Sequence, residues 1–315
     1  MRAAVVNTPA EPPVCADFPE PEPLPGREPL QLVGAGLHHV VRGQASGRHY
    51  GSDHRYPLVP GVDAVACTGD GRLVYTGFAA APWGTMADRL VTPFDVAIPE
   101  GADPLAVAAG MNPALSGWVV LTARRDEVGQ LGTVLVLGAT GMSGTMAVQG
   151  ALALGATRVV AAGRDPEALE RLQNAGAVPV SLAHDGPDAL TAAVAETPPS
   201  LVLDYVWGPV AEAAFAALGQ RGAGDDTADI AYVQIGSLAG FDAMLPAALL
   251  RSRRIRITGS GAGSTSRQKM LAEVPAVLSG FADGTFSPAY TAYPLSRVGD
   301  AWAHQGRTRA VIVPD

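Results

Sequence analysis

A glycine-rich turn between an apolar run and a stretch of small residues constrains the fold of this chain more than any other feature. Residues 133–137 read Thr-Val-Leu-Val-Leu, as in a buried strand, and residues 143–154 are mostly small and apolar, as in a buried helix. Between them lie Ala139, Gly141 and Gly144, spaced as Ala-x-Gly-x-x-Gly. A turn of this spacing between a strand and a helix is typical of a βαβ unit in a parallel sheet.

The alternation of strands and helices continues after this unit. We predict strands at residues 133–137, 158–162, 178–181, 201–205, 230–235 and 254–258, and helices at 143–154, 166–175, 188–196, 209–218 and 243–251. Strands that alternate with helices predict an α/β fold, here a Rossmann doubly wound parallel sheet.

The first part of the chain differs from this region in composition. It is rich in proline and glycine and holds short β-type runs at residues 30–33, 72–75 and 89–91, which predict a small, mostly-β barrel. A helix at 266–283 and β-like segments at 290–293 and 309–313 are expected to complete this barrel. The predicted domains are therefore residues 1–115 with 264–315, and residues 116–263.

The glycine-rich turn predicts a dinucleotide site. A residue without a side chain at Gly141 lets a pyrophosphate approach the helix N-terminus, where unpaired N–H groups and the helix dipole favour anions. Gly144 lets the helix pack closely on the strand. The candidate cofactor-binding residues of the turn are Ala139, Thr140, Gly141, Met142, Ser143 and Gly144.

The end of the second predicted strand indicates which dinucleotide is bound. An enzyme that uses NAD usually has an acidic residue there, whereas this chain has Gly163 followed by Arg164. Arginine can bind a 2′-phosphate through a bidentate contact, so the expected cofactor is NADP(H). The alternative is that Arg164 is a solvated surface residue while Asp165 caps the next helix. Both roles can hold together.

The carboxyl ends of the other strands should line the same crevice. They supply further candidates for contact with the ribose and the nicotinamide, namely Tyr205, Trp207, Gly236, Ser237, Gly259 and Ser260.

Composition excludes several classes of partner. A net charge of -8 disfavours nucleic acid as a partner, since such binders usually carry a basic surplus. Cys15 and Cys67 are too few for a disulfide framework and fit a reducing compartment. The apolar N-terminal run is too short for a signal peptide, and glycines with polar residues interrupt the weakly polar stretch 134–156. We expect a cytoplasmic protein without a membrane segment.

Several motifs together resemble the medium-chain dehydrogenase/reductase superfamily, and within it the zinc-less quinone oxidoreductase group. They are the glycine-rich turn and residues 57–63, 98–101, 111–118 and 250–252, so the resemblance spans nearly the whole chain. It implies a GroES-like N-terminal barrel beside the Rossmann domain. It also implies nicotinamide contacts from residues 112–116, including Ser116, and a homodimer formed through the strand at 254–258.

The chain departs from the zinc alcohol dehydrogenases of that superfamily. Their Gly-His-Glu is replaced by a segment with Val62 at the histidine position, and residues 36–40 lack their catalytic cysteine. A structural zinc site needs four clustered ligands, and the chain has two cysteines. The spacing of His38, His39, His49 and His54 is irregular, so we predict no metal site.

Without a metal to polarise the substrate, an acceptor that is already electrophilic is expected. Quinones and α,β-unsaturated carbonyl compounds meet this condition, because charge from an added hydride spreads onto a conjugated oxygen. The candidates for a catalytic donor to that oxygen are His38, Tyr50, Tyr56 and Asn112, with His38, Tyr50 and Asn112 preferred.

Two other nucleotide-binding classes do not fit. The only lysine, Lys269, follows Thr265 by four positions, which excludes the Tyr-x-x-x-Lys pair of short-chain dehydrogenases, and no P-loop is present. The alternative from another class is an NADPH-binding redox sensor or a structural, crystallin-like protein with little catalysis.

Overall fold

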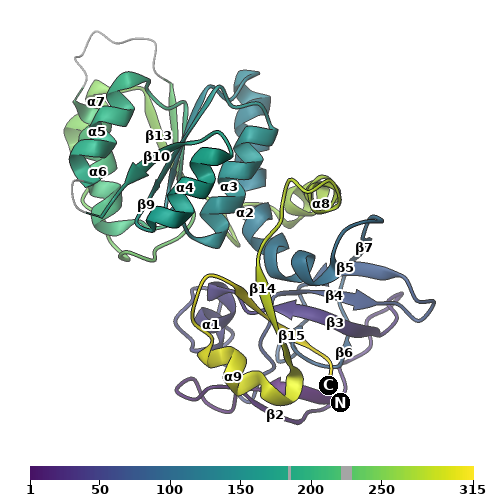
Figure 1. The fold of residues 1–315 in the computed structure, drawn as a ribbon. Helices are drawn as coiled ribbons and strands as arrows, with labels where there is room; N and C mark the ends of the chain where they lie inside the picture. Colours follow the sequence, from purple (N-terminus) through teal and green to yellow (C-terminus); the bar gives the residue numbers. More distant parts are fainter. Residues whose placement is uncertain (184–185, 221–228) are drawn as a thin grey trace. The chain divides into compact units, whose positions relative to one another are not determined.

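The computed structural model describes residues 1–183, 186–220 and 229–315, and these form two compact units (Figure 1). The first comprises Met1–Asn112 with Val274–Asp315, and the second comprises Pro113–Glu273. The second boundary lies ten residues beyond the predicted 263, inside helix α8 (Arg267–Ala282). The start of α8 belongs to the second unit because Met270 packs against that unit's core and Glu273 accepts a hydrogen bond from the indole of Trp118.

The second unit is built on a parallel sheet, as predicted. Its described strands lie in the order β10-β9-β8-β11-β12-β13, the order of a doubly wound dinucleotide-binding sheet. Their bounds are β8 (Thr133–Leu137), β9 (Arg158–Gly163), β10 (Val178–Ser181), β11 (Leu201–Asp204), β12 (Ile230–Gln234) and β13 (Ile255–Gly259).

Helices cover both faces of this sheet (Figure 1). They are α2 (Pro104–Val128), α3 (Met142–Ala153), α4 (Pro166–Asn174), α5 (Gly186–Glu196), α6 (Gly208–Gly219) and α7 (Ala247–Ser252). Side chains alternate along each strand, so Val134 and Val136 face the core under α2 and α3, whereas Leu135 and Leu137 face the core under α5 and α6. Helix α7 begins four residues later than predicted because Pro246 restricts the residues before it.

The first unit is mostly antiparallel. Its larger sheet has the order β14-β15-β3-β4-β5-β7, with β6 paired to β3, and β1 pairs with β2 in a second sheet. The strands are β1 (Arg2–Val5), β2 (Val14–Asp17), β3 (Leu30–Gly36), β4 (Asp63–Cys67), β5 (Leu73–Gly77), β6 (Arg89–Leu90), β7 (Asp95–Ala97), β14 (Tyr290–Pro294) and β15 (Arg309–Val313). The helices are α1 (His39–Ala45), α8, whose second half belongs here, and α9 (Val298–Ala303), preceded by a 3-10 turn at Leu295–Arg297.

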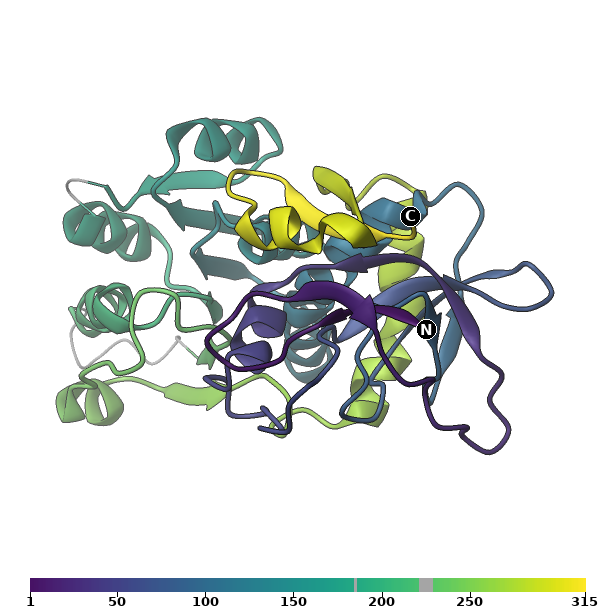
Figure 2. The same ribbon diagram turned by 90° about the horizontal axis from the view of Figure 1, so that it is seen from below.

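The end of the chain returns to this first unit, as the sequence predicts. Strand β15 pairs antiparallel with β3, so residues from the two ends of the chain lie side by side (Figure 2). This pairing places Val311 opposite Gly36, directly before the segment that carries His38.

Among the described helices, α2 is the one that is long and apolar enough to cross a membrane. Within its most apolar stretch, 72% is buried inside the protein. Burial of this extent is typical of a core helix, whose apolar residues pack against the sheet.

Candidate functional site

The glycine-rich turn is anchored to the neighbouring strand and leaves the helix after it uncapped. The backbone N–H groups of Gly138 and Ala139 both donate to the carbonyl of Ala162 in β9, at 2.9 Å. Helix α3 then begins at Met142, and Gly141 precedes it with an extended backbone and no side-chain cap. The first N–H groups of a helix have no partner inside the helix, so this terminus can receive an anion.

The glycines of the turn meet the steric conditions for a bound pyrophosphate. A Cβ at Gly141 would meet nothing closer than the Gly138 carbonyl oxygen at 3.5 Å, so the space in front of this residue is open. A Cβ at Gly144 would clash with that same carbonyl oxygen and lie 2.6 Å from the Cα of Ala139. Gly144 therefore allows the close packing of helix on strand, and Gly141 leaves room for a ligand.

The end of β9 shows why Gly163 carries no side chain. A Cβ there would clash with the methyl group of Thr140 and lie 2.7 Å from its hydroxyl oxygen. Arg164 follows with an exposed side chain that makes no ion pair or hydrogen bond to described residues. Asp165 accepts a hydrogen bond from the N–H of Ala168 at 3.1 Å, which confirms its role as the cap of α4.

A buried carboxylate, which the sequence did not single out, shapes the next strand end. Asp204 accepts hydrogen bonds from the N–H groups of Val206 (2.8 Å) and Trp207 (2.9 Å), and the hydroxyl of Tyr232 donates to its other oxygen at 2.6 Å. Burial raises the pKa of Asp204, opposed by these donors. The sequence signal that could have identified Asp204 is an acidic residue directly after the apolar run Leu-Val-Leu. Asp204 holds the turn that carries Tyr205 and Trp207.

Several predicted contacts at the strand ends have packing roles in this structure. The ring of Trp207 packs on Phe215 and Tyr232. The hydroxyl of Tyr205 lies 3.4 Å from that of Ser116, and burial raises the pKa of Tyr205. A Cβ at Gly236 would lie 2.5 Å from the carbonyl oxygen of Tyr205. Cofactor contact by these residues and by the half-buried Ser237 stays a prediction.

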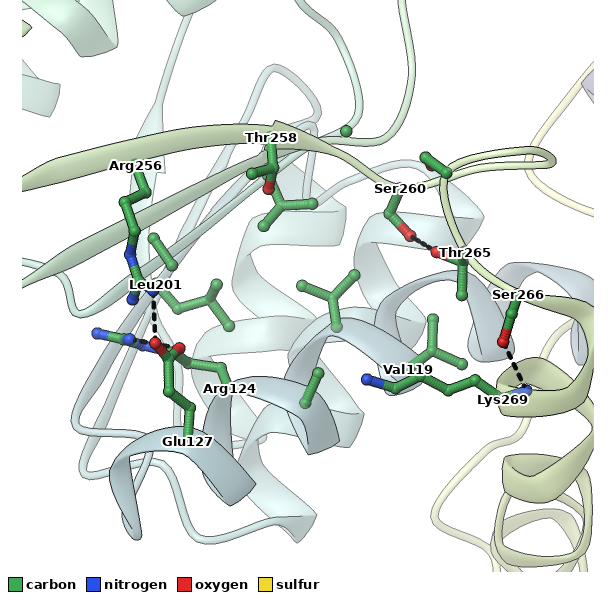
Figure 3. Close-up of a pocket in the computed structure, with 16 residues that line it drawn as sticks. Val119, Arg124, Glu127, Leu201, Arg256, Thr258, Ser260, Thr265, Ser266 and Lys269 are labelled. Carbon is green, nitrogen blue, oxygen red and sulfur yellow. Dashed lines mark hydrogen bonds and ion pairs between the residues drawn. The ribbon is translucent and has the colours of Figure 1, made fainter.

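Gly259 and Ser260 line a cavity of about 310 Å³ in the second unit, which we call the α2–β13 cavity (Figure 3). It lies between α2, the starts of β11 and β12, strand β13 and the segment that leads into α8. The residues of the glycine-rich turn do not line it.

The predicted catalytic residues of the first unit lie in different environments. His38 is 2% exposed, and its Nε2 lies 3.1 Å from Oδ1 of Asp63. The hydroxyl of Tyr75 donates to Oδ2 of Asp63 at 3.0 Å, and the backbone carbonyl of Asp63 accepts from Thr85. The Nδ1 atom of His38 is buried and has no hydrogen-bond partner among the described residues. Asp63 and Tyr75 were missed because the sequence does not show that β3, β4 and β5 are neighbours.

The other candidates are less enclosed. Tyr50 is 74% exposed, and its ring lies 4.1 Å from that of His49. Tyr56 donates to the backbone carbonyl of Ala45 at 2.8 Å, which is a packing role. Asn112 is half-buried within α2. A second cavity, of about 170 Å³, lies in the first unit near Asp53, but none of these candidates lines it.

Among the residues that the structure describes, there is no group of three or more His, Cys, Asp or Glu side chains that could hold a metal ion. A partly buried cation, Arg309, lies next to the segment that carries His38, since its guanidinium donates to the carbonyl of Leu37 at 3.1 Å.

Comparison with known proteins assigns the family. No family model matches the chain. A protein of Emericella nidulans called probable NADPH-dependent quinone reductase tdiC is 30% identical over 359 aligned residues, with full coverage of both chains. The quinone oxidoreductase of Thermus thermophilus, solved also with NADPH, is 25% identical with a TM-score of 0.79, and the match covers 99% of this chain and 100% of that one.

A second solved structure has the same fold at lower identity. It is a putative NADPH:quinone reductase of Mesorhizobium loti, 19% identical with a TM-score of 0.81, and the match covers 100% of this chain and 98% of that one. Fold, strand order and full-length similarity thus agree. The chain belongs to the medium-chain dehydrogenase/reductase superfamily, in its quinone oxidoreductase-like group.

Proposed function

We propose that this protein is an NADPH-dependent oxidoreductase that reduces a quinone or an α,β-unsaturated carbonyl compound without a metal ion. The observation that carries the proposal is the open space at Gly141, before an uncapped α3, beside Gly163 and the unpaired Arg164. The relative from Emericella nidulans is called an NADPH-dependent quinone reductase, and the Thermus thermophilus enzyme was solved with NADPH, which supports the same cofactor here.

The residues present fit this cofactor. The N–H groups at the start of α3 would hold the pyrophosphate, and the guanidinium of Arg164 would pair with the 2′-phosphate. Asp165 is engaged as a helix cap and adds no free carboxylate toward that phosphate. When bound, NADPH supplies the hydride.

The class of acceptor follows from how the protein can stabilise the negative charge that develops on the substrate oxygen during hydride transfer. Val62 stands where zinc relatives have a histidine ligand, so the developing oxyanion needs another source of stabilisation. Conjugated acceptors spread this charge themselves, and one well-placed hydrogen-bond donor in a dry site stabilises the rest.

We assign the donor role to His38. Nε2–H of His38 donates to Oδ1 of Asp63. In the ring form that carries a proton on both nitrogens, Nδ1–H, which has no partner among the described residues, would donate to the oxyanion. Tyr75 occupies the other oxygen of Asp63, which fixes the carboxylate. Tyr50 lacks such enclosure, because most of its surface faces solvent.

The edge strand β13 is the basis for a proposed mode of assembly. Strand β13 stands at one end of the strand order, so one of its edges is unpaired among the described residues. An unpaired edge can add a strand from a second copy, and we propose a cytoplasmic homodimer formed in this way.

The cofactor assignment is tested by Arg164→Ala. Loss of a charge-assisted phosphate contact should lower the ratio of kcat/KM for NADPH to that for NADH by on the order of tenfold or more. Arg171→Ala, which removes an exposed arginine within α4, should leave the ratio unchanged. An unaltered ratio in Arg164→Ala would remove the phosphate role.

The same assay separates the enzyme from the sensor or crystallin-like alternative. An enzyme consumes NADPH with some member of a panel of quinones, enones and 2-alkenals. A protein that NADPH stabilises against thermal unfolding, but that turns over no acceptor of the panel, would be a binder instead.

A further inference from the structure

The α2–β13 cavity has an apolar floor and a polar rim (Figure 3). Its floor is formed by Val119, Val120, Ala123, Leu201, Ala231 and Val233. Hydroxyl-bearing residues of β13 and of the segment between β13 and α8 line the rim, namely Thr258, Ser260, Ser264, Thr265 and Ser266. At about 310 Å³ its volume lies at the lower end of the range of small-molecule sites.

Among the described charged residues that line this cavity, one cation has no ion-pair partner. At one end, Arg124 and Arg256 pair with Glu127 and Asp229, so these four charges cancel. Lys269 lines the cavity as well, and no acidic group among the described residues pairs with it. Figure 3 shows it among the residues that line the cavity, which include Val119. The net charge of the lining and its partners is therefore one positive charge.

Lys269 is exposed, and its place in the fold favours an anion nearby. It lies in the first turn of α8, a helix of 16 residues, where Ser266 accepts from its backbone N–H at 3.2 Å. This turn contains no acidic residue. A cation at a helix N-terminus is repelled by the helix dipole, whereas an anion would be attracted by both.

From these observations we infer that the α2–β13 cavity binds a small monocarboxylate with an apolar body. The carboxylate would lie at Lys269 and the rim hydroxyls, and the body would cover the apolar floor. The single uncompensated positive charge matches a monoanion, and the floor offers no polar group to a second charged end. Of the predicted cofactor contacts the cavity contains Gly259 and Ser260 but not the glycine-rich turn, so this ligand would bind next to NADPH and together with it.

Binding of 3-phenylpropionate, measured by calorimetry with NADPH at saturation, tests the inference. The wild type should bind 3-phenylpropionate but bind 3-phenylpropionamide, its neutral analogue, at least about tenfold more weakly. Lys269→Met should weaken carboxylate binding by a similar factor, and Lys269→Arg should retain it. Arg251→Met, which removes an exposed cation of α7 outside the cavity, should change nothing.

A variant of the floor gives an independent check. Ala123→Phe fills the cavity and should abolish binding while Lys269 keeps its charge. The inference is overturned if the wild type does not bind 3-phenylpropionate, if Lys269→Met binds it as tightly as the wild type, or if NADPH displaces it. None of these outcomes depends on turnover of an acceptor.

Discussion

His38 and Asp63 form a buried pair of ionisable side chains in the first unit, and each of their polar atoms has a distinct partner or none. Asp63 is 4% exposed and has both carboxylate oxygens engaged, one by His38 and one by Tyr75. Burial and the negative charge of Asp63 raise the pKa of Tyr75, so its hydroxyl stays a donor. A carboxylate held in this way accepts from Nε2–H of His38 and sets the orientation of the ring, and in the proposed mechanism the other nitrogen, Nδ1, donates to the reacting oxygen.

Asp63→Asn should therefore lower kcat by on the order of tenfold or more while the KM for NADPH changes little. The amide can still accept from Tyr75, but it presents no negative charge to Nε2–H of His38. ¹⁵N spectra should show Nε2 of His38 protonated in the wild type, and a smaller protonated fraction at this nitrogen in the variant. Asp70→Asn, at an exposed acid between β4 and β5, is the matched control. An unchanged protonation of Nε2 in Asp63→Asn would contradict the positioning role.

At the scale of elements, β9 and the glycine-rich turn are fitted to each other. Gly163 ends β9 directly against the side chain of Thr140, so the absence of an acidic residue has a steric cause beside the electrostatic one. Cofactor preference is thus a property of two segments and not of one position. An acid introduced at residue 163 must displace Thr140 before it can bind a ribose.

Gly163→Asp alone is expected to destabilise the protein and to use neither cofactor well, because the new Cβ clashes with Thr140. The double variant Gly163→Asp with Thr140→Ala removes the methyl and hydroxyl groups, and the nearest side-chain atom is then the Cβ at 3.0 Å. It should recover stability and raise the kcat/KM ratio of NADH to NADPH above that of the wild type. Thermal unfolding and kinetics with both cofactors measure this, and equal stability of the single and double variants would show that Thr140 is not the obstacle.

On the scale of the whole molecule, each unit has its own core, and the second unit adds an ion-pair network. Arg124 of α2 donates to Glu127 at 2.8 Å and to the carboxylate of Asp229 at 3.0 Å, and Arg256 of β13 also pairs with both acids. The two arginines lower the pKa of Glu127 to about 2. Glu127 is 44% exposed, so solvent screens the network and its contribution to stability is modest.

Because the folded-state pKa of Glu127 is depressed, its contribution is present above its ordinary pKa of 4.5 and is lost as the pH falls toward about 2. Glu127→Gln should lower the free energy of unfolding at pH 7, and its difference from the wild type should shrink as the pH falls from 4.5 toward about 2. Urea unfolding at several pH values measures this. Asp126→Asn, the neighbouring exposed acid, is the control, and a difference that is constant with pH would contradict the ion-pair role.

The strands and helices of the second unit were predicted well because each of their sequence signals lies within a few neighbouring residues. The strand at residues 133–137 has the predicted bounds, and β9 and α3 differ from theirs by one residue. Turn chemistry and periodicity act within a few residues, so the chain order alone carries them. The Asp165 cap is of the same kind, since donor and acceptor are three residues apart.

The sequence by itself thus determined the doubly wound sheet, the open turn at Gly141 and the segment at Gly163 and Arg164. Only the tertiary structure decided that His38 meets Asp63 and Tyr75, that Thr140 fills the space at Gly163, and that Lys269 lines a cavity with α2 and β13. These contacts join residues from separate elements. Strand order and packing decide which residues meet. Both depend on the whole fold, so these contacts do not appear as a periodic pattern in the sequence.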